Sequence, residues 1–165
     1  NKIKNKAKYN LLVLTDYSKE SFNEQMQIIN DCHERINRIV NIVIKSHPNR
    51  ILKRTDFPKI NFISSNEPIE KLMAKSDVVF TGSNTTASVD AYCTGIPTIT
   101  MINSKALNVH PLRGMEGFKV VSNAKELVIA LETISGLSSR KYLDRKEYYH
   151  LDDNLRKWKK LLGIK

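Results

Sequence analysis

The sequence has 165 residues and a mass of 18.9 kDa, which suits one compact domain with a small appendage. Hydrophobic residues make up 41% and charged residues 27%, with 6 Gly and 5 Pro, which excludes disordered, collagen-like and low-complexity classes. No apolar run approaches the roughly 18 residues of a membrane span, and the basic N-terminus leads into no apolar signal segment. Cys32 and Cys93 have no second thiol near them, so neither a disulfide framework nor a zinc knuckle is expected. We therefore expect a cytoplasmic protein and, since the first residue is not Met, a piece of a longer chain.

The net charge of +10 is concentrated in the two ends of the chain. Residues 1–60 carry 12 basic and 6 acidic side chains, residues 61–121 carry 5 and 5, and residues 122–165 carry 10 and 6. A nucleic-acid binder would gather its Lys and Arg on one element with aromatic residues between them. The pattern instead favours a solvated basic surface, or a cationic face toward an anionic lipid, glycan or nucleotide.

Hydrophobic periodicity and turn residues predict alternating strands and helices. The longest element is an amphipathic helix over 19–40, for which Ser18 is the expected N-cap. In chain order the expected elements are strand 10–14, helix 19–40, strand 42–44, strand 61–64, helix 67–75, strand 77–81, helix 85–93, strand 97–102, strand 118–121 and helix 124–134.

Strands that are apolar on both faces and alternate with helices indicate a mostly parallel sheet covered on both sides. The expected fold is a three-layer α/β/α, Rossmann-like domain of about six strands over 10–139, which follows a basic lead or linker over 1–9. Residues 140–165 form a helical tail, expected to pack on this domain or on a neighbouring one. Its apolar stripe comprises Leu151, Leu155, Trp158, Leu161 and Leu162.

Ligands of open α/β sheets bind beyond the carboxyl ends of the strands. Neither a G-x-G-x-x-G nor a P-loop motif occurs there, so any phosphate site is of another kind. The best candidate is the segment 81–88, where a buried strand turns through Gly82 into a helix N-terminus that can hold a phosphate. Its candidate ligand-binding residues are Ser83, Asn84, Thr85 and Thr86. The alternative is that one of these polar residues merely caps the helix.

Four further side chains are candidates at the same edge. Asp90 can reach ligand hydroxyls from the helix that follows, or is a solvated carboxylate. His47 can donate to a phosphate or protonate a leaving group, and Pro48 stiffens the turn that aims it. Arg113, near His110 in a long loop, can clamp an anion, although a plain loop is equally expected. No metal-ligand spacing, catalytic triad or close carboxylate pair is present, so no metal and no self-sufficient catalytic centre are expected.

Three parts of the sequence resemble known families. Residues 76–99, Ser-Asp-Val-Val-Phe-Thr-Gly-Ser-Asn-Thr-Thr-Ala-Ser-Val-Asp-Ala-Tyr-Cys-Thr-Gly-Ile-Pro-Thr-Ile, resemble the donor-binding segment of GT-B glycosyltransferases. The Lys-x-His-Pro turn at 45–48 together with the loop 83–86 is similar to motifs of bacterial sialyl-, polysialyl- and Kdo-transferases, which use CMP-sugars. The stretch 148–162, with Leu-Arg-Gly at 112–114, resembles bacterial surface-carbohydrate biosynthesis proteins.

The resemblance, which covers residues 10–162, implies roles for these residues. The loop 83–86 and His47 would hold the nucleotide phosphate, and Asp90 would contact the ribose, although many GT-B enzymes carry Glu at that position. The nucleobase would lie near 64–67, next to Asn66 and Glu67. No cofactor beyond the nucleotide-sugar substrate is implied.

The resulting expectation is the donor-binding half of a glycosyltransferase that builds a bacterial surface polysaccharide, with a CMP-sugar as the suspected donor and UDP- or GDP-sugars still open. The tail helix 151–162 would cross to a missing N-terminal domain that binds a glycan or lipid-linked acceptor and supplies the catalytic base. The chain alone is then expected to bind without turnover, with peripheral contact to the inner membrane. The alternatives are half of a nonhydrolysing UDP-sugar 2-epimerase and a non-enzymatic basic docking module.

Overall fold

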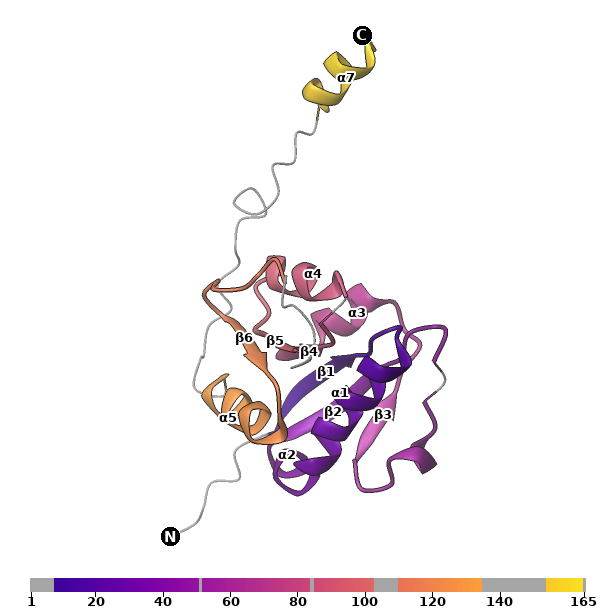
Figure 1. The fold of residues 1–165 in the computed structure, drawn as a ribbon, viewed down its shortest axis with the longest axis vertical. Coiled ribbons are helices and arrows are strands. Elements are labelled where there is room, and N and C mark those ends of the chain that lie inside the picture. Colours follow the sequence, from indigo (N-terminus) through magenta and orange to yellow (C-terminus); the bar gives the residue numbers. More distant parts are fainter. Residues whose placement is uncertain (1–7, 51, 84, 103–109, 135–153, 165) are drawn as a thin grey trace.

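The computed structural model describes residues 8–50, 52–83, 85–102, 110–134 and 154–164. Its centre is a six-stranded sheet in which every neighbouring pair of strands is parallel, in the order β3-β2-β1-β4-β5-β6 (Figure 1). The strands are β1 (Tyr9–Leu14), β2 (Val40–Lys45), β3 (Phe62–Ser64), β4 (Val78–Thr81), β5 (Thr98–Met101) and β6 (Phe118–Val121). The predicted parallel α/β fold is confirmed, and β1 begins one residue inside the expected lead.

Helices cover both faces of this sheet. They are α1 (Lys19–Asp31), α2 (His33–Ile39), α3 (Ile69–Ala74), α4 (Ala87–Cys93), α5 (Ala124–Ile134) and α7 (Arg156–Leu162), with a short 3-10 helix η1 (Arg54–Asp56). Leu11 and Val13 of β1 pack in the same core as α1, α2 and α5. Leu12 and Leu14 face the other way, into the core formed with α3 and α4. Burial on both faces explains why the strand reads as a continuous apolar run.

The expected helix over 19–40 is wrong in two respects, and the first is that the helix is interrupted at Cys32. The backbone there has φ −115°, and the N–H groups of Arg35 and Ile36 both donate to the Cys32 carbonyl to begin α2. Val40, expected in the helix, belongs to β2. Cys32 and Ile36 are nevertheless both buried in one core. The apolar periodicity therefore continues across the break and gives no sign of it.

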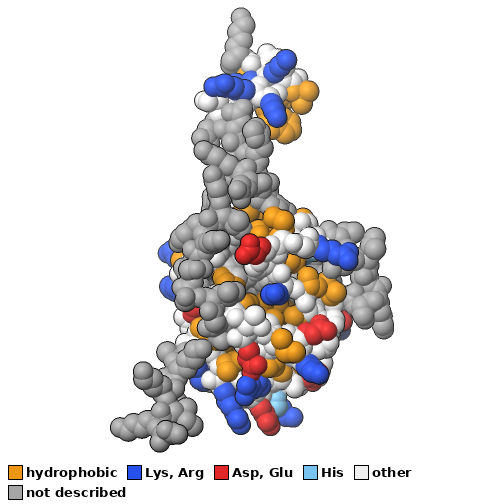
Figure 2. All heavy atoms as spheres, turned by 90° about the vertical axis from the view of Figure 1, so that its left-hand side faces the viewer, with side chains coloured by type: hydrophobic (Ala, Val, Ile, Leu, Met, Phe, Trp, Pro, Cys, Tyr) orange, Lys and Arg blue, Asp and Glu red, His pale blue; other side chains and the backbone are white. Residues whose placement is uncertain are grey.

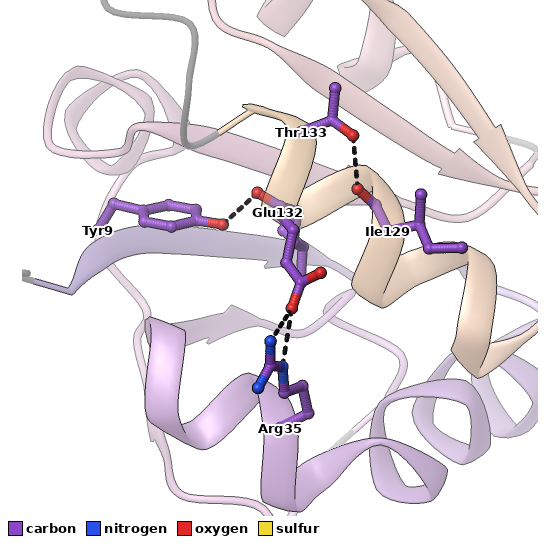
Figure 3. Close-up of polar contacts among 6 residues, drawn as sticks. Tyr9, Arg35, Ile129, Glu132 and Thr133 are labelled. Carbon is purple, nitrogen blue, oxygen red and sulfur yellow. Dashed lines mark hydrogen bonds and ion pairs between the residues drawn. The ribbon is translucent and has the colours of Figure 1, made fainter.

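Three polar contacts hold α5 to the rest of the domain (Figure 3). The Tyr9 hydroxyl donates to the Leu131 carbonyl. The pKa of Tyr9 is raised to about 12, mainly because the side chain is partly buried and secondly because the Glu132 carboxylate is nearby. Arg35 of α2 donates from Nε to Glu132 Oε1 at 2.7 Å and forms an exposed ion pair with it. The start of β1, α2 and α5 are thereby joined, although they are distant in sequence.

The tail contains a helix, α7, that follows Leu155. All described residues of the tail, 154–164, are exposed. Residues 151–153, expected in the same helix, lie outside the described residues, as do 1–7 of the expected lead. Packing of the tail on this domain or on another therefore stays a prediction. Among the helices that the structure describes, none has the length and apolar character needed to cross a membrane.

Candidate functional site

The order of the strands changes direction between β1 and β4. From β1 the chain proceeds to β2 and β3 on one side, and it then returns to build β4, β5 and β6 on the other. Because α1 and α4 pack on opposite faces, the connections that follow β1 and β4 leave the sheet in opposite directions (Figure 1). Such a switch point opens a crevice at the carboxyl ends of the strands.

Asp16 and Gly82 meet at this switch point. Asp16 follows β1, is 1% exposed, and accepts hydrogen bonds from the Tyr17 N–H at 2.7 Å and the Ser21 hydroxyl at 2.8 Å. A Cβ on residue 82 would lie 2.7 Å from Asp16 Oδ2, closer than side chains tolerate. Gly82 is thus required by the close approach of Asp16. Sequence reasoning treated Asp16 only as a turn former, although an Asp directly after a buried strand was the available signal.

His47 lies on the neighbouring connection, after β2. Its backbone N–H donates to Thr15 Oγ1 at 3.0 Å, and its Nδ1 accepts from the Asn49 N–H at 3.3 Å. Since Nδ1 is an acceptor, the neutral ring carries its proton on Nε2 and presents a donor there. Pro48, which follows, is exposed. The structure therefore brings the predicted His-Pro turn to the loop that holds Asp16.

Tyr17 and Arg50 belong to the same cluster, and sequence reasoning missed both. The rings of Tyr17 and His47 are 6.3 Å apart between centroids and tilted by 59°. Arg50 Nε donates to the Tyr17 carbonyl at 3.3 Å. An arginine two residues after the His-Pro pair was a visible signal for an additional cation at this edge.

The loop after β3 carries Asn66 and Glu67, both exposed. Lys45 Nζ donates to the Glu67 carbonyl at 2.8 Å, which joins this loop to the end of β2. The Glu67 carboxylate forms an ion pair with Lys75 at 2.8 Å, and this hydrogen bond lowers the pKa of Glu67. The two residues predicted near a nucleobase therefore lie at the same edge as His47.

The hydroxyl-rich loop between β4 and α4 is only partly as expected. Ser83 and Thr85 are half-buried, Thr86 and Asp90 are exposed, and Asn84 lies outside the described residues. Thr85 Oγ1 accepts from the Ala87 N–H at 3.2 Å, and the N-cap residue of α4, Thr86, makes no side-chain capping hydrogen bond. Helix α4 begins at 87, two residues later than predicted.

His110 is linked to this loop by hydrogen bonds through Ser88. Its Nδ1 accepts from the Leu112 N–H at 3.2 Å, so the proton of the neutral ring lies on Nε2, 2.8 Å from the Ser88 hydroxyl. Ser88 in turn donates to the Thr85 carbonyl at 2.8 Å. The ring stacks on Phe118 at 4.7 Å, and burial lowers the pKa of His110. His110 is therefore a neutral positioning residue.

Arg113 lies on the turn that follows His110, and its backbone N–H donates to the His110 carbonyl at 3.1 Å. Its side chain is exposed. The first part of this loop, 103–109, lies outside the described residues. Arg113 is therefore attached to the hydroxyl-rich loop through His110, and its contact with an anion stays a prediction.

A separate open groove of about 640 Å³ lies between the α1–α2 junction and α5. None of the predicted site residues lines it. In the part of the chain that the structure describes, no group of three His, Cys, Asp or Glu side chains is placed to hold a metal ion. The groove is lined by Asp31, Cys32, His33, Glu34, Arg35, Ala124, Lys125, Val128 and Ile129.

No protein-family model and no curated protein sequence matches the chain, but solved structures share its fold. The glycosyltransferase SnogD from Streptomyces nogalater superimposes with a TM-score of 0.52 at 8% identity, over 82% of this chain and 40% of its own. A protein from Listeria monocytogenes assigned as a UDP-N-acetylglucosamine 2-epimerase superimposes with a TM-score of 0.58 at 17% identity, over 88% of this chain and 46% of its own. WaaG, a glycosyltransferase involved in lipopolysaccharide biosynthesis, superimposes with a TM-score of 0.51 at 16% identity, over 78% of this chain and 39% of its own.

The chain spans less than half the length of each of these three proteins. At such identities the likeness establishes the fold. The chain therefore shares its fold with part of two glycosyltransferases and part of an epimerase. The similarity extends over most of this chain.

Proposed function

We propose that this chain is the donor-binding half of a glycosyltransferase and that it holds the phosphate of a nucleotide-sugar at the carboxyl edge of β1 and β4. The observation that carries the proposal is the contact of Gly82 with Asp16 at the switch point. This contact places the loop after β4 against the loop after β1. The loop after β1 also accepts a hydrogen bond from the His47 N–H at Thr15 Oγ1. The shared fold with two glycosyltransferases supports the reaction class.

Each side chain at this edge has a role in the proposal. Ser83, Thr85 and Thr86 offer hydroxyl groups to the phosphate at the start of α4. His47 Nε2–H donates to the same phosphate, on which negative charge develops as the nucleotide departs. Asp90, one turn further along α4, accepts from the ribose hydroxyls, and Asn66 with Glu67 contact the base.

The finer proposal is a CMP-sugar donor and a role in bacterial surface polysaccharide. It rests on the resemblance of the turn 45–48 and the loop 83–86 to CMP-sugar transferases. The acceptor and the catalytic base belong to a second domain in this proposal. The 165-residue chain is then expected to bind the nucleotide and to leave the sugar untransferred.

A second candidate is half of a UDP-sugar 2-epimerase. The observation in its favour is the Listeria structure, which covers 88% of this chain with a TM-score of 0.58. The two candidates differ in the nucleotide that they require, because the epimerase acts on UDP-sugars.

The test is thermal unfolding of the chain with CMP, UDP, GDP, AMP or inorganic phosphate at one ionic strength. A nucleotide at 100 times its dissociation constant adds about 2.7 kcal/mol to the free energy of unfolding. We expect one nucleotide, CMP, to stabilise the chain, and His47→Ala and Thr85→Ala to remove the effect. The matched controls are His33→Ala and Thr133→Ala, which lie on α2 and α5.

The other outcomes separate the alternatives. Stabilisation by UDP alone would exclude the CMP-sugar donor and leave a UDP-sugar transferase and the epimerase, and stabilisation by phosphate alone would remove the nucleotide from the proposal. If no ligand stabilises the chain, the donor-binding proposal is wrong for this chain and the basic docking module gains weight. Equal losses in the controls and the site variants would show that the substitutions act through the fold.

A further inference from the structure

Helix α7 has an apolar face that is exposed in this structure. Trp158 is 60% exposed, Leu161 75% and Leu162 61%, and these are large side chains that folding ordinarily buries. Leu155, which precedes the helix, and Ile164, which follows it, are exposed as well. The same face carries the only Trp of the sequence.

The opposite face of α7 is cationic. With about 100° between successive residues of a helix, Trp158, Leu161 and Leu162 fall within one arc of α7. Arg156 and Lys160 lie opposite this arc, Lys157 and Lys159 lie at its two borders, and residues 154–164 contain no Asp or Glu. Figure 2 shows α7 at the top of the molecule, with its orange side chains gathered on the right and blue side chains on the left and bordering the orange ones.

We propose that α7 docks this chain onto the surface of an anionic lipid bilayer. A short helix with Trp and Leu on one face and Lys on the other lies in the interface plane, with its apolar face among the acyl chains. The lysines then lie at the level of the headgroups, where each basic residue near an anionic surface strengthens binding about fivefold. No described helix can span a membrane, so the attachment is to one surface.

Charge decides between a bilayer and a second copy of the chain. The chain has a net charge of +10, so two copies of it repel one another. An anionic bilayer instead neutralises the lysines while it covers the apolar face. This inference is independent of the nucleotide site, so it can fail or succeed without affecting the proposed function.

Trp158 makes the test direct, because it is the only tryptophan and lies on the docking face. The full 165-residue chain is titrated with vesicles of phosphatidylcholine containing about 30% phosphatidylglycerol, and with vesicles of phosphatidylcholine alone. We expect the emission of Trp158 to move to shorter wavelength with the anionic vesicles only. We also expect the chain to sediment with them, and high salt to release it.

Three double variants separate the roles of the lysines of α7, of the general charge and of the apolar face. Lys159→Gln/Lys160→Gln is expected to weaken partitioning about thirtyfold. Lys119→Gln/Lys125→Gln removes the same charge from the body of the domain and is expected to leave most of the binding. Leu161→Gln/Leu162→Gln is expected to abolish the Trp158 shift.

Four results would overturn the proposal. Equal binding to neutral and anionic vesicles would remove the role of the lysines, and equal losses in the two lysine pairs would remove the role of α7. A Trp158 shift that appears with rising protein concentration and without vesicles would show that a second copy covers the helix. No shift and no sedimentation with anionic vesicles would leave the apolar face to a protein partner, and the proposal would be wrong.

Discussion

The hydroxyl groups of Thr81 and Thr100 lie 2.7 Å apart between β4 and β5, and both side chains are fully buried. The two residues are direct neighbours in the register of the parallel pair. One hydroxyl donates to the other inside the sheet, and Thr81 directly precedes Gly82. The pair is thus placed at the base of the candidate site.

We expect Thr81→Val to lower the free energy of unfolding by about 1–3 kcal/mol, because it leaves the Thr100 hydroxyl buried without its partner. The double variant Thr81→Val/Thr100→Val removes both hydroxyls and is expected to recover most of that loss. Urea denaturation of the four proteins gives the coupling energy. Additive losses in the double variant would contradict the pairing.

Gly82→Ala is expected to destabilise the domain by about 1–3 kcal/mol, as overpacking does. The added Cβ would lie 2.7 Å from Asp16 Oδ2 and 2.9 Å from Asp16 Cβ, so the β4 loop or Asp16 must move. In an Asp16→Gly background those atoms are absent, and the same substitution is expected to cost much less. An equal cost in both backgrounds, measured by urea denaturation, would show that the contact with Asp16 is not the cause.

Lowering the pH is expected to lower the free energy of unfolding of the domain through protonation of His110. Burial lowers the pKa of this ring in the folded chain below its ordinary value of 6.5. Its contribution is fully present above pH 6.5 and is lost as the pH falls through the folded pKa, because the unfolded chain then binds a proton that the folded chain does not. For one such group the slope reaches at most about 1.4 kcal/mol per pH unit.

His110→Asn keeps an acceptor for the Leu112 N–H and removes the titrating ring. We expect the variant to lose less free energy of unfolding than the parent between pH 7.5 and pH 5, a window above the titration of Glu67 and Glu126, whose pKa values are lowered. Urea denaturation at each pH measures the slope. Parallel profiles for the two proteins would refute the role given to His110.

Alkali is expected to act through Tyr9. Its folded pKa of about 12 lies above the ordinary value of 10.0, so its contribution is present below pH 10 and is lost as the pH rises through 12. Tyr9→Phe is therefore expected to flatten the alkaline limb of the stability profile. The comparison is Tyr17→Phe, at an exposed site, which is expected to keep the limb. A Tyr9→Phe profile as steep as that of the parent would contradict the assignment.

If the donor-binding proposal holds, Asp90→Asn is expected to weaken nucleotide binding about tenfold, the value of one hydrogen bond to a charged group. The loss should be absent for a 2′,3′-dideoxynucleotide, which lacks the hydroxyls that Asp90 accepts from. Isothermal titration with both ligands measures it, with Glu70→Gln on α3 as the control. Equal losses for both ligands would remove Asp90 from the ribose.

The sequence was sufficient to predict the strands and most of the helices of the fold, but it was insufficient to predict the contacts between them. Each predicted strand was found, because strands buried on both faces, such as Leu11–Leu14, form apolar runs that stand out from their surroundings. The break at Cys32 was missed because Cys32 and Ile36 keep the apolar spacing across it. Helix bounds differed by one or two residues where, as at Thr85, a polar residue can either cap a helix or begin it.

At the candidate site the sequence identified loops but not partners. His47 and Gly82 were found because they directly follow strands. The contact of Gly82 with Asp16 depends on β1 lying beside β4, which hydrophobic patterns do not reveal. Arg50 and Tyr17 were missed for the same reason, since their contact joins the connections after two different strands.

The position of β1 also constrains how the chain can assemble. β1 pairs with β2 on one side and with β4 on the other, and the Asn10 N–H bonds the Asp77 carboxylate across 67 residues. As the nascent chain leaves the ribosome, one edge of β1 has no partner until β4 has been synthesised. Strand β1 is apolar on both faces, and an apolar strand with an unpaired edge can pair with other chains. The interval between the synthesis of β1 and that of β4 is therefore when this protein is most exposed to aggregation.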